Sequence, residues 1–104
     1  MTDYYEAILE NRFIDKIRQA VEFDEENYSR LCDLLREIGE STSVDEKIEK
    51  RLVLVLYSIP QMVRNSFLSF SGDPADLPEI ALKLEDAWVD LDQLVLNIFQ
   101  PREA

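Results

Sequence analysis

Apolar residues recur every three or four positions along nearly the whole chain, which is the spacing of one face of an α-helix. No segment alternates apolar and polar residues in the way that a half-buried strand does. Helices are expected over roughly residues 3–23, 24–39, 44–70 and 78–99. Short connections favour antiparallel neighbours, so the predicted fold is all-α, a compact bundle of four to five antiparallel helices in a single domain, residues 1–104.

Residues at the expected helix ends support these boundaries. Asp24 is a candidate N-cap, and Gly39 can adopt the left-handed conformation that ends a helix. Ser43 and Glu46 have the spacing of a capping box, which predicts a helix start near Val44. The remaining signals are a loop at residues 71–74, a cap at Asp76 before the last helix, and Pro101 just beyond it.

The apolar run from Leu52 to Tyr57 fits either a buried strand or a buried helix. No second strand-like segment can pair with it, and an unpaired strand would leave backbone groups without partners. We therefore interpret the run as part of a helix that is apolar on all sides and central in the fold. Pro60 lacks an amide hydrogen and its ring opposes the carbonyl of Leu56, so the helix is expected to kink or restart there, which would give the fifth helix.

The chain is strongly acidic, with 22 acidic and 11 basic residues and a net charge of -11. Carboxylates repel phosphate backbones and anionic headgroups, so we expect no nucleic-acid or membrane partner and a basic protein partner instead. The charge is uneven, because residues 47–70 hold four bases and one acid whereas residues 71–100 hold seven acids and one base. Solubility and pairing within the fold are the competing explanation for this pattern.

Few residue types for catalysis are present. The chain has no histidine, its two glycines stand apart, and Cys32 lies on an apolar helix face where a structural thiol is expected. We therefore predict no enzyme activity, no cofactor and no metal. The lone cysteine, with no signal peptide and no membrane span, indicates a reducing, cytoplasmic setting. Acid pairs keep a metal-dependent nucleotide hydrolase as a third hypothesis; they are Glu22 with Glu25, Glu37 with Glu40, and Glu46 with Glu49.

The last helix carries two apolar stripes. One contains Leu84, Trp88 and Leu91 and is the expected core face. The other, spaced by seven, consists of Leu82, Val89 and Leu96 and is edged by the acids Glu85, Asp86 and Asp92. This second stripe has two explanations: either the helix is central with a neighbour on each side, or an exposed strip binds a partner or a second copy.

Acids four residues apart repel each other on a helix, so stability does not explain pairs such as Asp86 with Asp90. A surface that meets cations would explain them. The predicted partner-binding residues are Glu85, Asp86, Val89, Asp90 and Asp92 on the last helix, with Glu22, Asp24 and Glu25 in the acidic turn.

In size, charge and helicity the chain resembles, at the level of class, the small acidic all-helical immunity proteins that neutralise basic bacterial nuclease toxins, including those of contact-dependent growth inhibition. The segment Glu85-Asp86-Ala87-Trp88-Val89-Asp90-Leu91-Asp92 and the acidic turn from Glu22 to Glu26 carry this resemblance. It implies a non-enzymatic inhibitor that caps the cationic surface of a toxin domain. The alternative is an acidic helical adaptor or accessory subunit, in one form a homodimer through Leu82, Val89 and Leu96.

Overall fold

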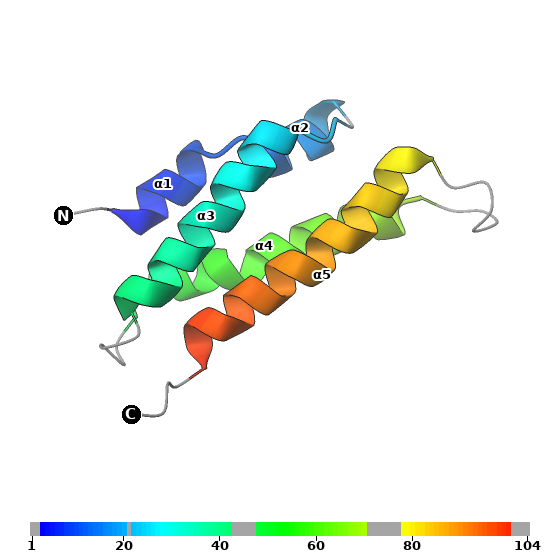
Figure 1. Cartoon of the computed structure of the whole chain (residues 1–104). Coiled ribbons are helices and arrows are strands. Elements are labelled where there is room, and N and C mark those ends of the chain that lie inside the picture. The colour runs from blue at the N-terminus through cyan, green and yellow to red at the C-terminus, as the bar shows by residue number, and fades with distance from the viewer. Residues whose placement is uncertain (1–2, 21, 43–47, 71–77, 101–104) are drawn as a thin grey trace.

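The structure, a computed structural model, describes residues 3–20, 22–42, 48–70 and 78–100 (Figure 1). All regular structure in these residues is helical, which confirms the all-α prediction. The helices are α1 (Tyr4–Glu10), α2 (Phe13–Ala20), α3 (Glu25–Thr42), α4 (Lys50–Leu68) and α5 (Glu79–Phe99). The predicted loop at residues 71–74, the Ser43 capping box, Asp76 and Pro101 lie outside the described residues.

The helices form a bundle with four corners, in which α1 and α2 together occupy one corner (Figure 1). Helix α5 packs between α3 and α4, and the α1–α2 pair completes the ring. Helices α3 and α4 follow each other in the chain, yet none of their described Cα atoms approach within 8 Å, so the two helices lie at opposite corners and meet only through side chains in the core. As a result α3 and α5 are neighbours that run in the same direction, which departs from the predicted antiparallel order.

The fifth helix comes from a break at Asn11, whereas the sequence placed the candidate break at Pro60. Helix α1 ends at Glu10 and α2 begins at Phe13, so the predicted single helix over residues 3–23 is wrong. The Asn11 side chain accepts a hydrogen bond from the Phe13 amide, and such side-chain bonds compete with the helical ladder. Helix α4 passes through Pro60 without restarting.

Two predicted helix ends also differ from the structure. Helix α3 continues past Gly39 to Thr42, and the position of a Cβ on Gly39 would be 3.6 Å from the Ile98 side chain. The glycine thus lies where α3 passes close to α5. The described part of the next helix begins at Lys50 instead of continuing from a start near Val44, because Ile48 and Glu49 are not helical; Val44 itself lies outside the described residues.

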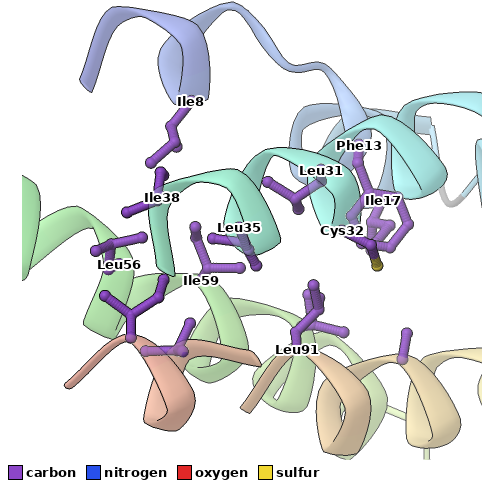
Figure 2. Packing of buried hydrophobic residues seen from close by; sticks show 14 of the residues in the cluster. Ile8, Phe13, Ile17, Leu31, Cys32, Leu35, Ile38, Leu56, Ile59 and Leu91 are labelled. Atoms are coloured by element: carbon purple, nitrogen blue, oxygen red, sulfur yellow. The ribbon is translucent and has the colours of Figure 1, made fainter. Parts of the chain in front are cut away.

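All five helices contribute side chains to one core (Figure 2). Figure 2 shows Leu35 and Ile38 of α3 pointing towards Leu56 and Ile59 of α4 across the bundle, with Leu91 of α5 below them. An aromatic cluster closes the α2–α3 end, where the ring centroid of Phe13 lies 5.1 Å from Phe23 and 5.0 Å from Tyr28. Burial of these apolar groups is the main source of stability.

Candidate functional site

The second apolar stripe of α5 lies on the outside of the bundle. Leu82, Val89 and Leu96 are 51%, 49% and 46% exposed, whereas Leu84 and Leu91 on the opposite stripe are fully buried. Helices α3 and α4 flank α5 without covering this stripe, so the interpretation in which a neighbouring helix packs on the second stripe is wrong. The stripe is an exposed apolar strip in this chain.

The four predicted acids of α5 divide between two sides of the helix. Asp90 faces α3, where its carboxylate accepts a hydrogen bond from the Tyr28 hydroxyl at 3.4 Å, and Asp86 lies one turn earlier on the same side. Glu85 and Asp92 lie one turn either side of Trp88, which faces α4. In the described part of the chain, no cation lies within 4.0 Å of these four acids.

Trp88 contacts α4 directly. The Arg64 guanidinium lies over its indole ring, 5.6 Å from the ring centroid, which is within range of a cation–π interaction. The indole N–H is buried and has no hydrogen-bond acceptor among the described residues. Trp88 therefore marks the side of α5 on which Glu85, Asp92 and the exposed strip adjoin α4.

The acidic turn has a structural role. The predicted N-cap role of Asp24 is confirmed, because its carboxylate accepts a hydrogen bond from the Asn27 backbone amide, in the first turn of α3, at 3.0 Å. The Lys16 ammonium also donates to Asp24, and this bond is the main reason that the pKa of Asp24 lies far below its usual value. The Asp24 side chain is only 13% exposed. Its carboxylate is thus occupied within the fold.

The same turn is tied to α5. Glu25 accepts a hydrogen bond from Lys83 at 2.9 Å, which joins the start of α3 to the first half of α5. The Lys83 ammonium also lies 5.7 Å from the centre of the Phe23 ring. Glu22 is exposed. The structure therefore places the turn beside the first half of α5, with Glu25 already paired.

A groove runs between α3 and α5, and we call it the α3–α5 groove. The residues that line it are Tyr28, Ser29, Cys32, Asp33 and Arg36 from α3, and Asp90, Gln93 and Leu94 from α5. Asp33 and Asp90 thus lie on opposite sides of it. Cys32 is 7% exposed, as expected for a structural thiol. Burial raises the pKa of both Cys32 and Tyr28, so neither group ionises at neutral pH.

The charges are segregated between the corners of the bundle. Helices α3 and α5 together hold ten acidic and three basic residues. Helices α1, α2 and α4 together hold three acidic and five basic residues, and α4 has no acid at all. The negative potential of the helices is therefore concentrated on the α3–α5 side.

Sequence reasoning missed the exposed apolar residues of α4. The run from Leu52 to Tyr57 is helical as predicted, but Leu54 is 70% and Tyr57 is 62% exposed, so this helix is not apolar and buried on all sides. Leu68 is also exposed. The spacing of fourteen residues between Leu54 and Leu68 places them on one stripe, which was the available signal.

No group of three or more acidic, cysteine or histidine side chains that could hold a metal lies together in the described ranges. Within those ranges, no helix combines the length and the hydropathy that crossing a membrane requires. Comparison of the chain with protein-family models, with curated proteins and with solved structures gives no match.

Proposed function

We propose that the chain binds a cationic protein through its α3–α5 side and that this partner is a basic toxin domain, which the chain blocks as an immunity protein. The observation that carries the proposal is the set of acids on α5. Asp86 and Asp90 point outward beside the α3–α5 groove, and within the described residues neither has a cation within 4.0 Å. Acids four residues apart cost a helix stability, so binding is a more direct explanation for them than folding.

The α3–α5 groove suits an arginine or lysine side chain. Its lining includes the apolar Leu94 and the sulfur of Cys32, against which an aliphatic stem can pack. Asp33 and Asp90 then receive the charged head from opposite sides, with Asp33 exchanging its present partner Arg36, 3.1 Å away, for the ligand. A partner with several such side chains would also be steered to this side by the long-range potential.

The acidic turn contributes less in this proposal than the sequence suggested. Asp24 is committed to Lys16 and to the start of α3, and Glu25 is paired with Lys83. Glu22 remains exposed and adds to the potential at this end of the bundle. The proposed contact residues are therefore Asp86 and Asp90 with Asp33.

The test is co-expression with the product of the reading frame beside this gene, because an immunity gene is expected next to its toxin gene. The double variant Asp86→Asn/Asp90→Asn should bind that product at least about tenfold more weakly and protect cells less. Its matched control is Glu6→Gln/Glu10→Gln, which removes the same charge from α1. The control should bind within about twofold of the original chain.

Two outcomes would contradict the proposal. Equal losses from both double variants would mean that net charge matters and that the α3–α5 side does not. A neighbouring product that neither binds the chain nor harms cells would overturn the immunity function itself. Unfolding of the Asp86→Asn/Asp90→Asn chain is not expected, since removing this like-charge pair should raise stability by about 0.2 to 0.5 kcal/mol.

A further inference from the structure

The outer surface of α4 and α5 gathers nearly all the exposed large apolar side chains of the described residues. Eight of the nine lie on these two helices, and Leu9 of α1 is the ninth. The eight are Val53, Leu54, Tyr57 and Leu68 of α4, and Leu82, Val89, Leu96 and Phe99 of α5. We call this surface the α4–α5 face. Where the helices meet at one end, Leu54, Tyr57 and Phe99 line a shallow apolar hollow.

Both helices present this face with the spacing of a coiled-coil seam, in which steps of three and four residues alternate. The α4 seam consists of Lys50, Leu54, Tyr57, Gln61, Arg64 and Leu68. The α5 seam consists of Leu82, Glu85, Val89, Asp92, Leu96 and Phe99. A partner helix would normally pack on such a seam, and no other described helix of the bundle covers the outer side of either one.

The two seams are complementary in charge. The α4 seam contains the cations Lys50 and Arg64 and no acid, whereas the α5 seam contains Glu85 and Asp92 and no cation. A surface that contains both a cationic seam and an anionic seam can pair with a second copy of itself about a two-fold axis, because each seam then meets the opposite charge. We propose that the α4–α5 face is the interface of a homodimer, in which α4 of each copy packs on α5 of the other.

The geometry of one copy determines which residues meet. A two-fold axis parallel to the helices keeps every residue at its own level, and Arg64 is level with Trp88. Arg64 therefore comes to lie between Glu85 and Asp92 of the second copy, each about one turn from that level. Leu54 and Tyr57 likewise meet Phe99 of the second copy, because they share its level in the apolar hollow.

The face is large enough for a moderate dimer. The 19 residues of α4 extend for about 28 Å, and two adjacent helices are about 20 Å wide, which gives about 560 Å² on each copy. The total of about 1,100 Å² is just above the area that a specific interface needs. Since two chains of charge -11 also repel each other, we expect dissociation in the micromolar range. Asp90 faces α3 and Asp86 borders the strip on that same side, so neither residue belongs to the α5 seam.

Sedimentation velocity on the full chain tests the proposal through a pair of charge reversals. In a dimer of the Arg64→Glu chain, an acid at position 64 would meet the acids Glu85 and Asp92 of the second copy. In a dimer of the Glu85→Lys/Asp92→Lys chain, Arg64 would meet two lysines. Each variant chain alone should therefore be monomeric. An equimolar mixture of the two chains should form a mixed dimer. In one of its two contacts the new acid at position 64 meets the new lysines at positions 85 and 92, and in the other contact the original Arg64 meets the original Glu85 and Asp92. Circular dichroism of each chain checks that both fold.

A milder substitution covers the case in which a reversal prevents folding. Leu82→Ser should raise the dimer dissociation constant about tenfold, whereas Leu9→Ser should leave it unchanged, because both leucines are 51% exposed and only Leu82 lies on the face. An original chain that stays monomeric up to millimolar concentration would overturn the proposal. So would a dimer that Leu82→Ser and Leu9→Ser weaken equally, or two folded reversal chains whose mixture remains monomeric. The Asp86→Asn/Asp90→Asn chain should still dimerise, which separates this proposal from toxin binding.

Discussion

The side-chain amide of Asn11 donates a hydrogen bond to the backbone carbonyl of Asn27 at 3.0 Å, and this bond joins the break between α1 and α2 to the first turn of α3. The oxygen of the same amide accepts from the Phe13 amide. One side chain thus begins α2 and fixes its position relative to α3. The aromatic cluster of Phe13, Phe23 and Tyr28 packs directly beside this junction.

Asn11→Ala should lower the free energy of unfolding by about 1 to 2 kcal/mol, since it removes a helix-start acceptor and the side-chain hydrogen bond that joins this break to Asn27 of α3. Urea denaturation followed by circular dichroism measures the change. Asn11→Asp is the matched control, because it keeps the acceptor for Phe13 and loses the donor to Asn27, while its added negative charge is favourable at the start of a helix. A smaller loss for Asn11→Asp than for Asn11→Ala is expected, and an unchanged Asn11→Ala chain would show that the break has another cause.

Asp24 should make stability depend on pH in the acid range. Folding lowers its pKa, chiefly through the hydrogen bond from Lys16, so the folded chain favours the ionised carboxylate. This contribution is complete above the unfolded pKa near 4 and is lost progressively as the pH falls below it. The stability that Asp24 contributes should therefore fall between pH 7 and pH 3, and thermal unfolding beside a variant that lacks this carboxylate measures the change.

Asp24→Asn isolates this contribution, because asparagine is also a good N-cap but cannot pair with Lys16 as an anion. The original chain should be the more stable of the two at pH 7. The difference should shrink towards pH 3, where the carboxyl group of unfolded Asp24 is protonated. A difference that is the same at both pH values would mean that the charge of Asp24 contributes nothing.

Helical spacing predicted the class of fold well, because each amphipathic stripe is local information. The break at Asn11 was missed since the apolar stripe continues through Leu9, Phe13 and Ile17 with no glycine or proline to interrupt it. At Gly39 the prediction failed in the opposite way, since a glycine is present but the helix does not end there. It has the residue type of a helix end, but α3 continues through it to Thr42, and a Cβ at this point would make only an ordinary contact with Ile98.

The candidate site was predictable in part. The α5 stripe and its acids can be identified from spacing in one segment, and the structure places the stripe outside. The separation of Asp86 and Asp90 from Glu85 and Asp92 depends on which helix lies on each side of α5. That arrangement follows from α3 and α4 occupying opposite corners, a tertiary relationship that no local pattern records.

Gly39→Ala should stabilise the chain by about 0.5 to 1 kcal/mol. Glycine inside a helix costs conformational entropy relative to alanine, and the new methyl group would meet Ile98 at an ordinary contact distance of 3.6 Å. Gly39→Leu should instead be destabilised, because its larger side chain must push α3 away from α5. Urea denaturation of both variants measures these effects, and a destabilised Gly39→Ala chain would show that the helices are closer than the structure indicates.

Salt should act in opposite directions on the two proposed interactions. Capture of a cationic partner by the α3–α5 side depends on attraction over distances that salt screens beyond about 8 Å at 0.15 M, so its association rate should fall as salt rises. Self-association begins from two chains of charge -11, whose long-range repulsion is screened by the same salt. The dimer dissociation constant should therefore fall several-fold between low and physiological ionic strength.

Sedimentation at the two salt concentrations measures the dissociation constant of the dimer, and surface plasmon resonance measures the association rate of the partner. A dimer that weakens over this range would mean that its contacts are dominated by exposed ion pairs, and Leu54, Tyr57 and Phe99 would then not be its main source of affinity.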